Sequence, residues 1–139
     1  SVTEIGSGAF NECDGLKSVY ISDISAWCQI SFGGMEANPL EHADNFYING
    51  EYVKEIVIPE GVTSIGDYAF AGHSTLTEIT IPKTVTEIGD EAFYGCDGVK
   101  NIYYGGSAED WKRIAISPNG NEKLVGGIFK RAKIHYNCK

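Results

Sequence analysis

The feature that most constrains the fold of this chain is an internal repeat. Three segments share the pattern V-T-x-I-G-x-x-A-F, and they begin at Val2, Val62 and Val85. The second and third copies are offset by 23 residues, and each continues to a Cys or a His and then to spaced aliphatic residues. One unit of this length cannot bury its apolar side chains alone, so neighbouring units must supply the other wall of the core. The sequence therefore predicts a stack of similar coils.

Each part of the repeat predicts a piece of local structure. The aliphatic residues that end a unit alternate, as at Ile79 and Ile81, and this spacing predicts a short strand with one buried face. Pro82 follows at once and ends the strand, because proline has no main-chain donor. The V-T-x-I stretch predicts a second short extended piece, and the Ala-Phe pair predicts a helical turn with the Phe as the main core side chain.

The repeat predicts two sets of structurally equivalent residues. The glycine of each copy is expected where the backbone turns with positive φ. These glycines are Gly6, Gly66 and Gly89. The phenylalanine of each copy is expected in one internal column. These phenylalanines are Phe10, Phe70 and Phe93.

A longer repeat is superimposed on the first. Trp27 matches Trp111 at an offset of 84 residues, and each predicts a short helix with a buried Trp as a core anchor rather than a sugar platform. Ser107 and Asp110 predict a capping box for the second of these helices. Strands are predicted at 46–49 and 134–137, and Asn49-Gly50 predicts a hairpin turn that leads into a strand from Tyr52 to Ile58.

These units divide the 139 residues into one domain of five coils. The boundaries are about 1–21, 22–58, 59–81, 82–104 and 105–139, the second and fifth coils being the Trp-helix units. The predicted fold class is an α/β repeat, with short strands on one face and short helices or turns on the other. The chain has no initiator Met and opens on a repeat, so we expect it to be a piece of a larger protein.

The pattern resembles the BspA-type (Treponema pallidum-type) leucine-rich repeats of bacterial surface proteins. The stretch from Ile81 to Cys96 fits this pattern throughout, and the Trp units resemble longer units found among such repeats in gut Firmicutes. His73 and Val99 replace the usual Cys and Leu, and Ser22 and Gly105 stand where Pro is expected. The resemblance implies a right-handed solenoid that is secreted or displayed on the cell surface. Some family members are adhesins that bind host matrix proteins or other bacteria, and the family shares no catalytic residues.

A leucine-rich repeat exposes side chains between the buried positions of its strands, and these form the candidate binding face. The first expected row is Ser18, Glu55, Glu78 and Asn101. The second expected row is Tyr20, Val57, Thr80 and Tyr103. Tyr20 and Tyr103 suit contacts with proteins or glycans, and the alternative is that they merely cover the sheet. The alternative function is a structural spacer that carries other modules of a surface protein.

Charge restricts the partners. Nineteen acidic and eleven basic residues give a net charge of −8, which repels nucleic acid and disfavours anionic lipid. No apolar run approaches the roughly 20 residues that span a bilayer. We therefore expect neither nucleic-acid binding nor membrane insertion, and a host matrix protein, another surface protein or a glycan as partner. Because terminal coils of a solenoid expose core, end-to-end self-association is a further expectation.

Catalysis, cofactors and metals are not expected. The three histidines are dispersed, and the sequence holds no H-E-x-x-H, P-loop or G-x-S-x-G motif. Asp44-Asn45 and the loop 119–122 have oxygen ligands but lack the spacing of an EF-hand. Cys13 and Cys96 occupy one repeat position and are expected as small buried side chains rather than disulfide partners, and Cys28 and Cys138 as thiols.

Overall fold

The computed structural model describes residues 2–119, 121 and 132–138. Its central coils follow one path: a strand, a turn at Pro59 or Pro82, a two-residue strand, a turn that carries the Ala-Phe pair, and the next strand. The strands of this path are β6 Glu55–Val57, β7 Ser64–Ile65, β8 Glu78–Ile81, β9 Glu87–Ile88, β10 Asn101–Tyr104, β11 Ala115–Ile116 and β12 Lys133–His135. The repeat in the sequence is thus a repeat in the fold.

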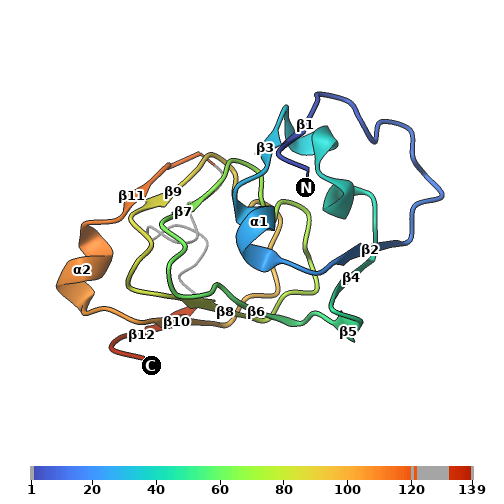
Figure 1. Ribbon diagram of the computed structural model, residues 1–139. Helices are drawn as coiled ribbons and strands as arrows, with labels where there is room; N and C mark the ends of the chain where they lie inside the picture. The colour runs from blue at the N-terminus through green and yellow to red at the C-terminus, as the bar shows by residue number, and fades with distance from the viewer. Residues whose placement is uncertain (1, 120, 122–131, 139) are drawn as a thin grey trace.

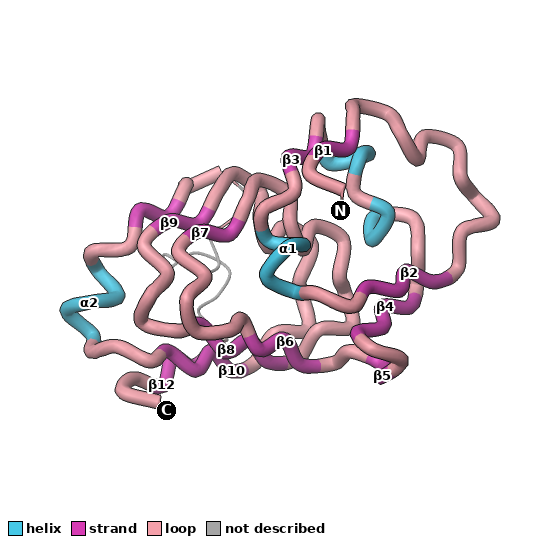
Figure 2. Tube along the Cα trace, in the orientation of Figure 1, coloured by secondary structure: helices cyan, strands magenta, loops and turns pink. Residues whose placement is uncertain are grey.

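Equivalent strands of successive coils lie side by side and parallel. One sheet has the order β12-β10-β8-β6 and a second has the order β11-β9-β7, and Figures 1 and 2 show them along opposite edges of the molecule. Main-chain bonds join the coils: the Thr77 amide donates to the Lys54 carbonyl at 2.8 Å, and the Lys100 amide to the Thr77 carbonyl at 2.8 Å. We call the sheet β12-β10-β8-β6 the main sheet. The second sheet is a ladder of very short strands, in which β7 and β9 are the extended V-T-x-I pieces that the sequence predicts, although the predicted fold class named only helices or turns for the face opposite the main sheet.

The N-terminal part of the chain forms its own sheets. Its strands are β1 Glu4–Ile5, β2 Ser18–Ile21, β3 Ser31–Phe32, β4 Asn45–Ile48 and β5 Glu51–Tyr52. β1 pairs with β3, and β2, β4 and β5 form a separate sheet in that order. The predicted hairpin is confirmed, since Asn49 and Gly50 both have positive φ and join antiparallel β4 and β5. The single strand predicted from Tyr52 to Ile58 is wrong, because the chain leaves one sheet after β5 and enters the other at β6.

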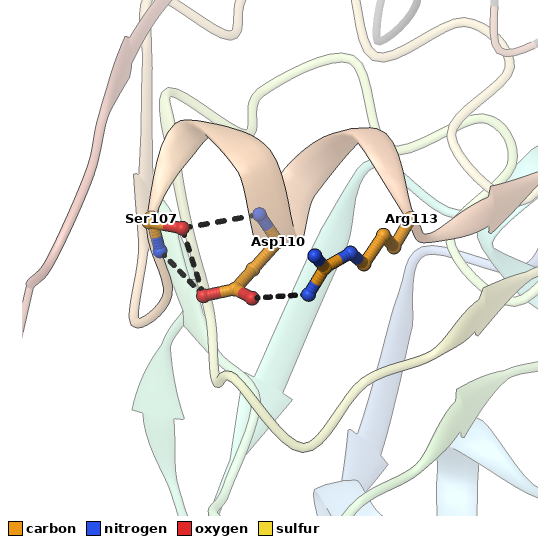
Figure 3. Close-up of polar contacts among 3 residues, drawn as sticks. All are labelled: Ser107, Asp110 and Arg113. Atoms are coloured by element: carbon orange, nitrogen blue, oxygen red, sulfur yellow. Dashed lines mark hydrogen bonds and ion pairs between the residues drawn. The ribbon is translucent and has the colours of Figure 1, made fainter.

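Two short helices carry the tryptophans, as the sequence predicts. They are α1 Ile24–Cys28 and α2 Ala108–Lys112, and 3-10 helices lie at Met35–Ala37 and Pro39–Glu41. Asp23 caps α1, and Ser107 forms the predicted capping box with Asp110 (Figure 3). The Ser107 amide and hydroxyl both donate to the Asp110 carboxylate, and these bonds lower the pKa of Asp110. Among the described helices, none has the length and apolar character needed to cross a membrane.

One hydrophobic cluster runs through the stack. Phe70 and Phe93 are fully buried and stacked, with their ring centroids 5.5 Å apart. Trp27 and Trp111 are also buried, which confirms them as core anchors. Phe10 is only half-buried and lies outside the cluster, so the predicted column of three rings is wrong at that member. The segment between β1 and β2, which carries Phe10, loops away from the other coils (Figure 1).

Gly66 and Gly89 of the repeat serve close packing rather than a turn with positive φ, whereas no atom lies within 4 Å of a Cβ placed on Gly6. Positive φ occurs two positions later in each copy, at Gly8, Tyr68 and Glu91, so the prediction for these glycines is wrong. A Cβ on Gly89 would lie 2.7 Å from the Asp67 main-chain nitrogen of the preceding coil. A Cβ on Gly66 would lie 3.0 Å from the Cys28 carbonyl oxygen. The repeat therefore needs glycine wherever a preceding coil approaches this closely.

Buried asparagines complete the hydrogen bonding where a Trp unit meets a regular coil. In regular coils the turn amides bond to the next turn, as in the 2.8 Å bond from the Phe70 amide to the Ala92 carbonyl. Where a Trp unit meets these coils, an asparagine side chain makes the corresponding bond. Asn38 donates from its side chain to the Ala69 carbonyl at 3.0 Å, and the Asn121 side-chain oxygen accepts from the Phe93 amide at 3.3 Å. Both asparagines are fully buried, so these bonds replace solvent for polar groups in the core.

Candidate functional site

The outward face of the main sheet is the candidate binding face. The register places Glu55, Glu78 and Asn101 side by side, and Val57, Thr80 and Tyr103 side by side. These six side chains are exposed or half-buried, while Ile56, Ile79 and Ile102 between them are buried. Alternation along each strand therefore produces the predicted exposed rows from β6 to β10.

The predicted rows do not extend to the N-terminal coil. Ser18 and Tyr20 belong to β2, which pairs with β4 and not with β6. Their neighbours are Asn45 and Tyr47 of the Trp unit. The expectation of one continuous row through Ser18 and Glu55 is therefore wrong, because β4, and not β6, lies beside β2 and the two strands belong to separate sheets.

Three tyrosine rings form a cluster on the N-terminal sheet. The Tyr20 ring stacks on the Tyr47 ring with centroids 4.7 Å apart, and the Tyr47 ring meets the Tyr52 ring edge-on at 5.5 Å. Tyr20 is 67% exposed and Tyr52 is 39% exposed. We call Tyr20, Tyr47 and Tyr52 the tyrosine cluster. Sequence reasoning found only Tyr20, although the hairpin prediction placed Tyr47 and Tyr52 on adjacent strands and could have found the other two.

A second aromatic contact lies at the C-terminal end of the main sheet. The Tyr103 ring stacks on the His135 imidazole with centroids 4.7 Å apart. Asn101 donates to the Glu78 carboxylate at 3.1 Å, and its side-chain oxygen lies 3.1 Å from His135 Nε2. Partial burial and the nearby Glu78 carboxylate raise the pKa of Tyr103, so its hydroxyl stays protonated and able to donate. His135 was missed because the strand 134–137 was not aligned with the predicted rows.

A groove lies where the N-terminal sheet β2-β4-β5 separates from β6, the edge strand of the main sheet. It has a volume of about 520 Å³. Its lining comes from α1, the β4–β5 hairpin and β6, and consists of Ile24, Ile48, Glu51, Tyr52, Val53, Lys54, Glu55 and Val57. Tyr52 belongs both to this groove and to the tyrosine cluster, so the two features form one continuous surface.

The buried titratable side chains His73 and Cys28 lie in the core. Burial lowers the pKa of His73 to about 4, and the ring meets Phe46 edge-on, so the imidazole is a neutral core group at neutral pH. Burial also raises the pKa of Cys28 to about 12. The Cys138 thiol donates to the His135 main-chain carbonyl rather than to the imidazole. No disulfide joins the cysteines of the described residues.

The described residues contain no group of three or more His, Cys, Asp or Glu side chains placed to hold a metal ion. Asn45, considered as a calcium ligand, instead donates to the Lys17 carbonyl at 3.2 Å. Part of the loop 119–122 lies outside the described residues, and Asn121 of that loop donates to the Gly89 carbonyl at 2.7 Å. Asn45 and Asn121 therefore form hydrogen bonds between segments of the fold.

Stacked parallel coils with an exposed strand face define a repeat protein. The profile of the BspA type Leucine rich repeat region matches residues 1–38 and 41–117 in six copies. The chain belongs to the BspA-type leucine-rich repeat family.

Comparison with individual proteins adds one similar structure. The chain is 32% identical to a leucine rich cell surface protein from Faecalibacterium prausnitzii A2-165, with a TM-score of 0.46. The match covers 82% of this chain and 32% of that protein, so this chain spans about a third of its length. No curated protein matches the chain.

Proposed function

We propose that this chain is a non-catalytic binding module of a secreted or cell-surface bacterial protein, in which a right-handed solenoid presents its strand face to a partner. The partner is a host matrix protein, another surface protein or a glycan. The observation that carries the proposal is the tyrosine cluster, whose stacked rings stand on an outward strand face with two of them well exposed to solvent.

The chemistry of tyrosine supports this role. A Tyr ring provides a large apolar surface with a polar hydroxyl at its edge, and few rotamers are lost when it binds. Stacking fixes the Tyr20 and Tyr47 rings against each other before any partner arrives. A fixed aromatic surface loses less conformational entropy on binding than mobile side chains do. The net charge of −8 favours neutral or basic partners over polyanions.

The test is a binding screen with immobilised matrix proteins and neutral glycans. The double variant Tyr20→Ala with Tyr103→Ala should weaken binding by about tenfold or more, because exposed aromatic anchors dominate interface energies. Tyr94→Ala is the matched control, since Tyr94 is 47% exposed but lies on a turn away from the strand face. Thermal unfolding should change little in all three proteins, and an unchanged binding profile in the double variant would contradict the proposal.

The alternative is a structural spacer. The continuous main-chain ladders from β6 to β12 favour it, because they give the stack a fixed geometry without any ligand. A spacer predicts that none of the strand-face substitutions alters binding in the screen. Neighbouring catalytic modules in the open reading frame would support the spacer, and a secretion signal with a wall anchor would support surface display.

Self-association through the N-terminal coil is a separate proposal. Val2 is 60% exposed, whereas its repeat equivalents Val62 and Val85 are buried beneath neighbouring coils. A second copy that covers Val2 would remove this apolar surface from water. Sedimentation should then show a concentration-dependent dimer that Val2→Lys abolishes, and a monomer at all concentrations would contradict it.

A further inference from the structure

The groove between the two sheets has an open strand edge. β6 is the edge strand of its sheet and, among the described residues, pairs only with β8. The Lys54 carbonyl accepts from Thr77 and the Ile58 amide donates to Thr80, so every second residue of this segment bonds toward β8. The main-chain groups of Glu55 and Val57 therefore point to the other side, where the groove lies.

The floor and rim of the groove differ in chemistry. Apolar side chains of Ile24, Ile48 and Val53 line it, and Val57 stands 62% exposed at the open edge. An exposed apolar side chain on an unpaired edge strand is usually avoided, because it invites another strand to add. This edge thus has both features that a strand-like partner needs, free main-chain groups and an apolar surface.

The acidic side chains around the groove indicate which kind of partner strand would bind there. Glu51 and Glu55 are exposed at the groove, and Glu78 stands next to Glu55 on the adjacent strand. Lys54 is the one basic residue of the described lining. The ion pairs of the described residues are confined to α2 and its C-cap, so no cation of the described residues neutralises these carboxylates, and Glu78 accepts a hydrogen bond from the neutral Asn101 amide. Like charges opposite each other on a sheet are unfavourable, and a basic partner would relieve this repulsion.

We propose that this groove binds an extended polypeptide segment in which apolar residues alternate with Lys or Arg, and that the segment adds to the sheet as a strand beside β6. Apolar side chains of the segment would face Ile24, Ile48 and Val53, and its basic side chains would face Glu51 and Glu55. The inference rests on the proposed binding function and names the partner for one part of that surface. Oligosaccharides and a second copy of the chain are the competing occupants.

The probe is a capped peptide, GKVKVKVG, titrated into the isotopically labelled chain while amide chemical shifts are followed. Saturable shifts should centre on Glu55, Val57 and Tyr52. Two further peptides separate the contributions: GEVEVEVG reverses the charge, and an N-methylated GKVKVKVG cannot donate along one main-chain edge. Cellohexaose is the glycan probe. Both altered peptides should bind at least about tenfold more weakly than the parent, as expected for lost charge complementarity and lost main-chain bonds.

Substitutions locate the site on the protein. Val57→Pro removes the amide that faces the groove but none that bonds to β8, so the sheet should persist and peptide affinity should fall by about three- to tenfold. Val57→Thr keeps the amide and is the control for the main-chain bond. Glu55→Gln should weaken peptide binding, whereas Glu87→Gln, an equal change of charge on exposed β9, should not.

The outcomes are distinguishable. Equal affinity for the N-methylated peptide, or unchanged affinity in Val57→Pro, would overturn strand addition. Equal affinity for the acidic peptide would overturn charge recognition. Shifts at these residues with cellohexaose alone, or dimerisation through β6 in sedimentation, would assign the groove to another occupant and overturn the proposal. If the peptide fails while the double tyrosine variant still loses binding in the screen, the proposed function stands and this inference falls.

Discussion

Replacing Gly89 by Ala should destabilise the stack through a clash with the preceding coil. The added Cβ would lie 2.7 Å from the Asp67 nitrogen and 3.0 Å from its Cα, well inside the 3.5–4.0 Å of a normal contact. Neither segment can retreat easily, because the Gly89 amide donates to the Ile65 carbonyl at 2.9 Å and the Asp90 amide donates to the Asp67 carboxylate at 2.8 Å. Overpacking of this kind costs about 1–3 kcal/mol.

The repeat supplies its own control. Gly6 occupies the same position in the first copy, but no atom lies within 4 Å of the place where its Cβ would stand. Gly6→Ala should therefore leave stability unchanged or raise it by about 0.4–1 kcal/mol, since alanine reduces the freedom of the unfolded chain.

Urea and thermal unfolding followed by circular dichroism measure both variants. Gly89→Ala should lower the midpoint temperature by about 3–10 °C, and Gly6→Ala should not lower it. Gly66→Ala should fall between them, because its Cβ would meet a carbonyl oxygen at 3.0 Å. Equal losses at Gly6 and Gly89 would refute the reasoning, because they would show that the glycines matter within a coil and not between coils.

Three other predictions follow from buried polar groups. Because burial lowers the pKa of His73 to about 4, protonation favours the unfolded chain, and stability should fall by up to roughly 3 kcal/mol as the pH drops from about 6.5 to about 4. His73→Cys should remove this part of the pH dependence of urea unfolding, and identical pH profiles for the two proteins would contradict it. Asn38→Ala should cost about 2–3 kcal/mol in the same assay, because the Tyr68 carbonyl loses the Asn38 donor and the Leu40 amide loses the Asn38 acceptor, while the Ala69 carbonyl keeps its bond from Trp27. A loss as small as that of an exposed substitution would contradict the assigned role. Because burial raises the pKa of Cys28 to about 12, iodoacetamide should label half-buried Cys13 first, as mass spectrometry would show, and equal labelling of both thiols would refute this.

The features that sequence analysis predicted correctly depend on residues within one coil. Alternating apolar residues define each strand, Ser107 and Asp110 are three residues apart in one helix turn, and Asn49-Gly50 is a local turn signal. The burial of the tryptophans also follows from local helical spacing. These signals act over a few residues, so one unit of the repeat already contains them.

The errors depend on how coils approach one another. The role of Gly89 follows from its distance to Asp67 in another coil, and no local pattern encodes that distance. The exposure of Phe10 follows from the way its segment loops away from the stack. Asn38 and Asn121 read as loop residues in sequence, although each replaces a main-chain bond that a regular coil would make.

In the candidate site, too, the features local to one strand could be predicted and those that depend on contacts between coils could not. The solvent-facing side of each strand could be predicted from alternation, which placed Tyr20 and Tyr103 outward. Their aromatic neighbours could not, because Tyr47 and His135 join the face only when the Trp units stack in register. The groove is a product of the break between β5 and β6, which depends on the packing of the whole hairpin.

Scalar couplings across hydrogen bonds test the stacking of coils most directly. They join the amide nitrogen of a donor to the carbonyl carbon of its acceptor, so they identify both partners. We expect couplings from Thr77 to Lys54, from Lys100 to Thr77 and from Lys133 to Lys100, whose bonds are each 2.8 Å long. Couplings from these amides only to carbonyls of their own coil would contradict the account.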